Sequence, residues 1–217
     1  MENQSFALIM AWPETVCKRP GGWYENLMHR TKFSKQGYYK VGHAAVTLIN
    51  GKSGACLYFD FGRYHAPYGY GRARDVETDL ELKITTQISF ESNRPTNLSQ
   101  LYHELQSREA CHGDGRLEVG LVPIDFEKAF LQAKKIQQND FVNYGPFTPY
   151  GTNCSRFVRE VVNAGHRSIG MKVAFKSCYA LTPTPRWLVN VTKTFNPQLQ
   201  MWNTELENDT FKVVNNA

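Results

Sequence analysis

The sequence lacks the features that mark a disulfide scaffold, a zinc-stapled domain or a membrane protein. Its five cysteines are odd in number and widely spaced, and none belongs to a CxxC pair. This pattern excludes a disulfide framework and argues against structural zinc. The apolar run near the N-terminus is short and has no basic leader, so it predicts neither a signal peptide nor a membrane span. We therefore expect a cytoplasmic protein with reduced thiols, without a metal or other cofactor and without stable membrane insertion.

Internal repeats, low-complexity tracts and Pro/Ser-rich linkers are also missing. The 217 residues are 41% hydrophobic and 21% charged, a composition that predicts one globular domain over residues 1–217. The net charge of +5 comes from dispersed side chains, and only Arg63, Arg72 and Arg74 lie close together in the chain. A nucleic-acid-binding protein would show a basic stripe or a known module, so we expect no nucleic-acid partner.

Hydrophobic periodicity predicts an α+β fold, an antiparallel sheet with helices packed on it. The expected strands are Ser5–Ala11, Val41–Ile49, Ala55–Phe61, Leu80–Phe90 and Leu117–Ile124. The expected helices are Thr96–Arg108, Phe126–Gln138 with Asp125 as cap, Asn153–Gly165, and a short one after Pro183. Loops are expected around Pro20–Gly22, over His65–Asp75 and over Asn143–Thr152, and a last hairpin over Thr204–Val214.

Cys154 lies in the first turn of one of these expected helices. There the unpaired backbone N–H groups and the positive end of the helix dipole favour a thiolate, and the same groups can hold an oxyanion. Phe157, Val158 and Val161 follow at helical spacing, so the thiol shares the inward stripe of the helix. A free cysteine is more often an inert buried side chain, so position alone does not make Cys154 a nucleophile.

A base for such a thiol stands on an earlier strand. Asn50-Gly51 separates two β-rich runs and predicts a two-residue hairpin turn, with Ile49 opposite Lys52 and His43 opposite Tyr58. Tyr58 and Asp60 then share the face of His43, and Asp60, diagonal to it, is the preferred group to orient the imidazole. A longer turn or a register shifted by one residue would change this arrangement.

The two motifs together resemble a known enzyme superfamily. VGHAAV on a strand, followed much later by YGTNCSRFV opening a helix, is similar to the circularly permuted papain-like hydrolases of the NlpC type. The Asn153-Cys154 pair with Phe157 is similar to the local motif of their lecithin retinol acyltransferase-like branch. The resemblance implies Cys154 as nucleophile, His43 as base and a third polar residue near Tyr58–Asp60. A second histidine at the usual place is missing, and His65, beyond the strand end, is a weaker candidate than Asp60.

Aromatic residues flank both motifs and are candidates for substrate contacts. The loop His65–Asp75 alternates Gly and Pro with aromatic residues and could form a cleft wall, although a plain surface loop would have the same composition. The candidate substrate-binding residues are Tyr58, Tyr68, Tyr70, Tyr150 and Asn153.

The function that follows is a cysteine amidase or peptidase. It would act through an acyl-thioester at Cys154, with His43 as base and Asp60 holding the imidazole tautomer, on a peptide or other small amide or ester. In the bacterial families of this superfamily, substrates include peptide bonds of cell-wall fragments. The alternatives are a lipid acyltransferase or thioesterase of the same fold, and a binding domain without catalysis.

Overall fold

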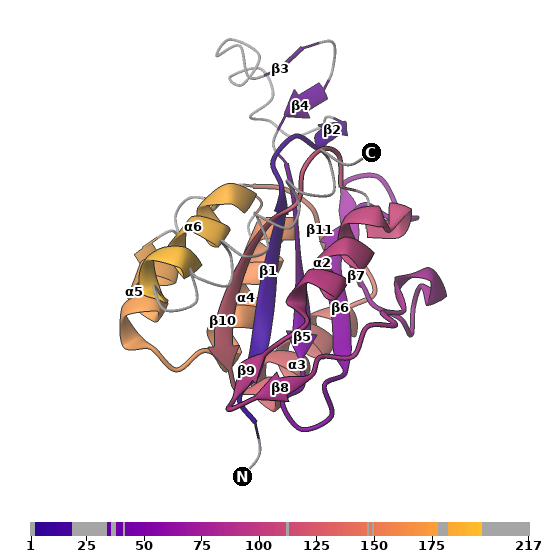
Figure 1. Cartoon of the computed structure of the whole chain (residues 1–217). Helices are drawn as coiled ribbons and strands as arrows, with labels where there is room; N and C mark the ends of the chain where they lie inside the picture. Colours follow the sequence, from indigo (N-terminus) through magenta and orange to yellow (C-terminus); the bar gives the residue numbers. More distant parts are fainter. Residues whose placement is uncertain are drawn as a thin grey trace.

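A six-stranded antiparallel sheet forms the centre of the protein in the computed structural model (Figure 1). The structure describes residues 3–18, 34–35, 38–40, 42–111, 113–146, 148, 150–177 and 182–196. The strand order is β10-β1-β5-β6-β7-β11. The bounds are Ser5–Trp12 for β1, His43–Ile49 for β5, Cys56–Gly62 for β6, Tyr70–Arg74 for β7, Glu118–Ile124 for β10 and Val142–Asn143 for β11. The predicted α+β class with an antiparallel sheet is confirmed.

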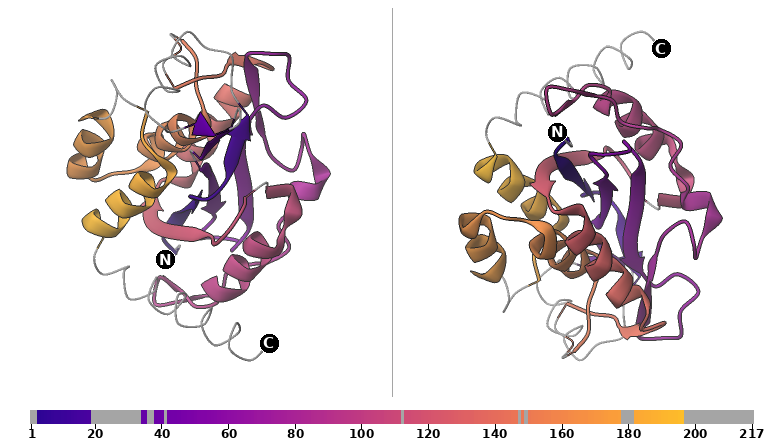
Figure 2. Two further views of the ribbon diagram at one scale, coloured as in Figure 1. Left: turned by 90° about the horizontal axis from the view of Figure 1, so that it is seen from above. Right: turned by 90° about the horizontal axis from the view of Figure 1, so that it is seen from below.

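Helices cover both faces of this sheet (Figure 2). One face packs against α3 (Phe126–Gln137), α4 (Cys154–Gly165), α5 (Ile169–Ser177) and α6 (Pro185–Phe195). The other face packs against α2 (Leu98–Ser107) and two 3₁₀ turns, Leu80–Leu82 and Glu109–Cys111. Short strands complete the fold: β2 (Val16–Lys18), β3 (Ser34–Lys35) and β4 (Tyr38–Lys40) form one small sheet, and β8 (Phe90–Glu91) pairs with β9 (Arg94–Pro95).

The central strands are apolar on both sides because both faces are covered. In β1, Ala7, Ile9 and Ala11 point toward the α4 layer, and Phe6, Leu8, Met10 and Trp12 point toward the α2 layer. This explains why the sequence of β1 is a continuous apolar run rather than an alternating one. The same division places Ala44 and Val46 of β5 in the α4 layer, and Ala45 in the α2 layer.

The turn between β5 and β6 is wider than predicted. Asn50 N–H donates to the Ala55 carbonyl and Gly54 N–H to the Asn50 carbonyl, so Ile49 pairs with Cys56 and not with Lys52. The Asn50 side chain stabilises this loop by accepting from the backbone N–H groups of Lys52 and Ser53, and Gly54 supplies a positive φ of 74°. The predicted two-residue turn, and with it the pairing of His43 with Tyr58, is therefore wrong.

Two other expectations fail on the neighbouring segments. The expected strand Leu80–Phe90 is a 3₁₀ turn followed by irregular chain up to Ser89, and only Phe90 is in a strand, β8. The backbone N–H groups of Thr85 and Thr86 donate to the Glu104 carboxylate on α2 and not to a strand. The expected loop His65–Asp75 contains β7, and α5 was not predicted. The segments Pro20–Gly22 and Thr204–Val214 lie outside the described residues.

The remaining predicted elements agree with the structure to within a few residues. Ser5–Ala11, Val41–Ile49, Ala55–Phe61 and Leu117–Ile124 correspond to β1, β5, β6 and β10. The predicted helices correspond to α2, α3, α4 and α6. Asp125 caps α3 as expected, since its side chain accepts from Lys128 N–H at 3.2 Å. No helix among the described residues is long and apolar enough to cross a membrane.

Candidate active site

Cys154 is the first residue of α4. The preceding Asn153 has extended backbone dihedrals, and its side-chain oxygen accepts from Arg156 N–H at 3.0 Å, which fixes the first turn. Phe157, Val158 and Val161 are buried against the sheet, as their spacing predicts. The Cys154 side chain is on this inward stripe and is 7% exposed. The thiol therefore stands where the helix dipole and free N–H groups favour an anion.

His43 begins β5 and meets the thiol at the end of the sheet. Its register partner on β1 is Trp12, whose ring stacks on the imidazole with centroids 5.9 Å apart. The Nε2 atom lies 3.5 Å from Asp60 Oδ2. The imidazole also interacts with the thiol of Cys154 and lowers its pKa. Because Nε2 is directed to Asp60, Nδ1 is the ring nitrogen left for the thiol.

Asp60 is completely buried and is surrounded by donors. Arg74 donates from Nε to Oδ1 at 3.0 Å and from Nη2 to Oδ2 at 2.7 Å. The hydroxyls of Tyr58 and Tyr64 both donate to Oδ2, at 3.0 and 3.1 Å. With these donors a carboxylate can remain ionised without water. His43 thus contacts a charge whose position is fixed from several sides.

The wider hairpin turn does not move Asp60 away from His43. The observed register places Asp60 opposite Ala45, two residues along β5 from His43. The pairing differs by four residues from the predicted one, because the partner of Ile49 is Cys56 instead of Lys52. Since side chains alternate with a period of two, an even shift leaves Asp60 on the face of His43.

The electrostatics of the three groups favour a charged pair. Burial alone would raise the pKa of the Cys154 thiol, but the hydrogen bond and charge of His43 outweigh it and lower that pKa. Burial would lower the pKa of His43, yet Asp60 and Cys154 raise it to about 9. Against the opposing effect of burial, His43 and Arg74 lower the pKa of Asp60 to about 2. Near neutral pH the arrangement favours a thiolate beside an imidazolium.

The aromatic candidates for substrate contacts are divided between the interior and the surface. Tyr58 is buried and donates to Asp60, so it belongs to the surroundings of that carboxylate and offers no surface to a substrate. Tyr68, Tyr70 and Tyr150 are exposed. Tyr70 pairs with Asn143 on the edge strand β11, and Thr152 N–H donates to the Asn143 carbonyl, two residues before Cys154. His65 is exposed in the loop before β7, and it is Asp60 that contacts His43.

Three residues at the site were not predicted. Trp12 stacks on His43, Tyr64 contacts both His43 and Asp60, and Arg74 pairs with Asp60. Arg72 and Arg74 did stand out as a local concentration of positive charge. Their alternation along β7 would have indicated that one face of a strand carries guanidinium groups, had the segment been assigned as a strand.

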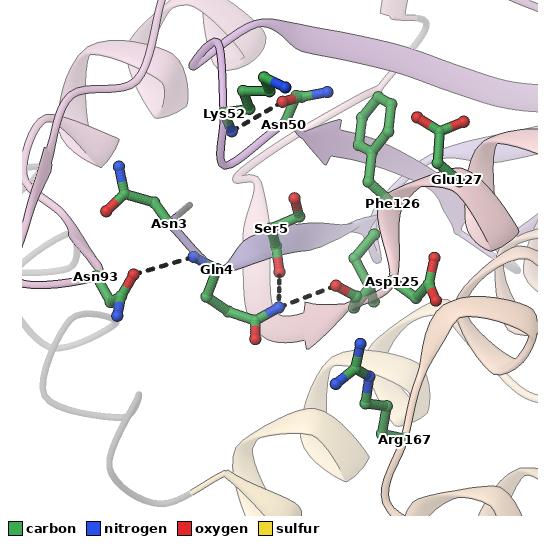
Figure 3. Close-up of a pocket in the computed structure, with 11 residues that line it drawn as sticks. Asn3, Gln4, Ser5, Asn50, Lys52, Asn93, Asp125, Phe126, Glu127 and Arg167 are labelled. Atoms are coloured by element: carbon green, nitrogen blue, oxygen red, sulfur yellow. Dashed lines mark hydrogen bonds between the residues drawn. The ribbon is translucent and has the colours of Figure 1, made fainter. Parts of the chain in front are cut away.

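A separate cavity lies at the opposite end of the sheet (Figure 3). Its volume is about 560 Å³, and it is bordered by the start of β1 and the start of α3, including Gln4, Asn93, Phe126 and Arg167. Trp12, which pairs with His43, is at the other end of β1. None of the candidate catalytic residues borders this cavity. Among the described residues no group of three His, Cys, Asp or Glu side chains could hold a metal ion.

Removing the cap of α4 tests how the helix start supports the thiol. We expect Asn153→Ala to cost about 1 kcal/mol of unfolding free energy and to slow alkylation of Cys154 at neutral pH, because the first turn loses its bond to Arg156 N–H. Thr184→Ala is the matched control, since Thr184 caps α6 by accepting from Trp187 N–H. It should cost a similar amount in a urea titration but leave alkylation unchanged. Equal alkylation rates in both variants would contradict a role for the cap at the thiol.

Comparison with known proteins identifies the family. Residues 7–171 match the family described as type VI secretion system effector TseH-like, which is more than half of the chain. The chain belongs to this family. The crystal structure of the type VI secretion system effector TseH is 21% identical, and the match covers 75% of this chain and 76% of that one with a TM-score of 0.49. No curated protein matches the sequence.

Proposed function

We propose that this member of the TseH-like effector family is a cysteine hydrolase that cleaves an amide bond through an acyl-thioester at Cys154. One observation carries the proposal: a thiol at a helix start faces a histidine whose Nε2 is directed to a buried carboxylate. This is the order of nucleophile, base and orienting group that thiol hydrolysis requires. The single-domain, permuted papain-like assignment of residues 1–217 is part of the same proposal.

The residues at the site would divide the reaction as follows. Nδ1 of His43 takes the thiol proton, and the thiolate attacks the substrate carbonyl carbon to give a tetrahedral intermediate. Backbone N–H groups at the start of α4 stabilise its oxyanion. When the intermediate collapses, the C–N bond breaks and the imidazolium gives its proton to the leaving amine. The neutral imidazole then takes a proton from water, whose oxygen attacks the thioester carbonyl carbon. The C–S bond breaks, the acid leaves, and the imidazolium returns its proton to the Cys154 sulfur.

The family assignment also bears on the substrate. The matched family is described as type VI secretion system effectors, and export through a secretion system is compatible with a substrate outside the cytoplasm of the producing cell. A peptide or a cell-wall-derived amide is the substrate class that we propose, with Tyr68, Tyr70 and Tyr150 as exposed side chains available for contact.

The pH dependence of alkylation tests the thiolate–imidazolium pair. With iodoacetamide, we expect the rate of Cys154 alkylation to rise through an apparent pKa below that of a free cysteine, about 8.5. In His43→Ala that pKa should rise, because only the hydrogen bonds from the Ala44 backbone and the Ser155 side chain then oppose the effect of burial on the thiol. His103→Ala, on α2, is the control and should match the wild type. A pKa near 8.5 that does not change in His43→Ala would refute the proposal.

The rate of hydrolysis plotted against pH should be bell-shaped, with its two limbs set by Cys154 and His43. The acidic limb follows the lowered pKa of Cys154, since protonation below it removes the nucleophile. The alkaline limb lies at about pH 9, where His43 loses the proton that the leaving amine needs.

Addition of a soluble amine distinguishes hydrolysis from acyl transfer. An acyltransferase would form a new amide with the added amine, whereas a hydrolase would release the acid.

A further inference from the structure

Tyr64 contacts two members of the proposed site at once. Its hydroxyl lies 3.3 Å from His43 Nε2 and 3.1 Å from Asp60 Oδ2, and it donates to the latter. A hydroxyl has a single proton, so a Tyr64 that donates to Asp60 can only accept from Nε2–H. The Nε2 proton thus faces two oxygens, Tyr64 Oη at 3.3 Å and Asp60 Oδ2 at 3.5 Å. The distance from Nε2 to the Asp60 carboxylate is therefore longer than the distance from Nε2 to the Tyr64 hydroxyl.

Three neighbouring residues fix the position of Tyr64. A Cβ on Gly62 would lie 2.4 Å from Tyr64 Cε2, so glycine at the end of β6 leaves the space that the ring occupies. The Arg74 guanidinium lies 3.4 Å from the ring centroid. Arg72 Nε donates to the Tyr64 carbonyl at 2.8 Å and is itself bound by both oxygens of Asp79. A ring fixed in this way can hold its hydroxyl at a set position.

The hydroxyl also keeps its proton over the working range of the site. Burial and the charge of Asp60 raise the pKa of Tyr64 well above its ordinary value, although Arg74 acts in the opposite direction. Tyr64 therefore stays a donor to Asp60 and an acceptor for Nε2–H. A neutral His43 with its proton on Nε2 presents a lone pair on Nδ1, which is the form that can take a proton from the thiol.

We propose that Tyr64 is a positioning residue of the thiol site, whose hydroxyl accepts Nε2–H of His43 and links it to Asp60. It selects the imidazole tautomer that leaves Nδ1 free for Cys154, and it stabilises the imidazolium by giving its Nε2 proton an acceptor. The inference rests on the proposed function, since it assigns Tyr64 a role in the same thiol chemistry.

Two tyrosines allow a matched test. Tyr58 and Tyr64 donate to the same Asp60 oxygen at nearly equal distances, but only Tyr64 contacts His43. Tyr→Phe at either position removes one hydroxyl and keeps the ring. Asp60 loses one donor in both variants, so the difference between them reports the contact with His43.

The readout is the pH profile of hydrolysis of an N-acyl p-nitroanilide, an amide whose leaving amine must be protonated, together with Cys154 alkylation, in the wild type, Tyr64→Phe and Tyr58→Phe. In Tyr64→Phe we expect about tenfold slower turnover and an alkaline limb shifted to lower pH by about one unit, since the imidazolium loses an acceptor. Tyr58→Phe should move that limb by less. Coincident profiles for all three proteins, or equal shifts in the two variants, would overturn the role of Tyr64.

A measurement on the wild type keeps the inference testable if Tyr64→Phe does not fold. The ¹⁵N NMR shifts of the His43 ring above pH 9 should show the tautomer protonated at Nε2, whereas protonation at Nδ1 would overturn the inference. Failure of the proposed function gives a different result: Cys154 of the wild type would then titrate as an ordinary thiol. A lowered thiol pKa in the wild type, without any effect of Tyr64→Phe, removes only the role of Tyr64.

Discussion

Cys154→Ala should abolish the acyl-enzyme burst that p-nitrophenyl acetate gives with the wild type, and lower steady turnover by about 10³-fold or more. The physical reason is that neither Cys56 nor Cys111 forms a thiolate near neutral pH. Burial raises the pKa of both Cys56 and Cys111 to about 12. Among the three cysteines whose side chains the structure describes, Cys154 combines a helix start with a histidine that lowers its pKa. The burst is measured by stopped-flow absorbance of p-nitrophenol.

Cys56→Ala is the matched control for this experiment. Cys56 is 6% exposed and Cys154 is 7% exposed, so the two residues are buried to the same extent. Cys56→Ala should keep the full burst, and mass spectrometry of the trapped wild-type intermediate should place the acetyl group on the peptide that contains Cys154. An undiminished burst in Cys154→Ala, or acetylation of a different cysteine, would contradict the nucleophile assignment.

The sequence was sufficient for the parts of the site that depend on local periodicity. The helix start at Cys154 follows from a capping residue and an apolar stripe, both readable over a few residues. The shared face of His43 and Asp60 follows from the two-residue period of strands. That inference holds although the turn was predicted wrongly, because the register differs from the predicted one by an even number of residues. An odd shift would have placed Asp60 on the opposite face of the sheet from His43.

The parts that could not be predicted depend on pairing between distant segments. Arg74 reaches Asp60 only because β7 pairs with β6 in the register Asp60–Arg74. The segment that contains β7 is rich in glycine and tyrosine, and its local pattern indicates a loop. It becomes a strand because β6 and β11 provide partners on both sides. Tyr64 reaches His43 by folding back over Gly62, a contact that no periodicity encodes.

The buried pair of Asp60 and Arg74 predicts the second large effect, this time on stability. We expect Arg74→Met to lower the free energy of unfolding by about 3–5 kcal/mol, because Asp60 remains buried without its main counter-charge. The side chains of the pair are 2% and 0% exposed. Arg72→Met is the control: Arg72 binds Asp79 through two hydrogen bonds, but these side chains are 18% and 8% exposed. Its loss of unfolding free energy in a urea titration should be smaller than that of Arg74→Met, because this pair is less buried.

Acid titration should separate the two variants further. The pKa of Asp60 is lowered to about 2, so its pairing stabilises the wild type above the ordinary pKa of an aspartate and is lost as the pH falls toward 2. Without Arg74 the pKa of Asp60 is less depressed, and Arg74→Met should unfold at a higher pH than the wild type. Arg72→Met, which leaves Asp60 paired, should follow the wild type more closely. Equal losses of unfolding free energy in Arg74→Met and Arg72→Met would show that burial of the Asp60–Arg74 pair has no energetic consequence.

The double variant Asp60→Leu with Arg74→Met tests whether the pair serves stability or the site. Apolar side chains in both positions remove the cost of burying two charges, so the double variant should regain much of the stability that either single variant loses. Its turnover of p-nitrophenyl acetate should stay low, because His43 Nε2 then lacks the carboxylate that raises the pKa of the imidazole. Recovered stability together with recovered turnover would mean that the Asp60 carboxylate does not support His43.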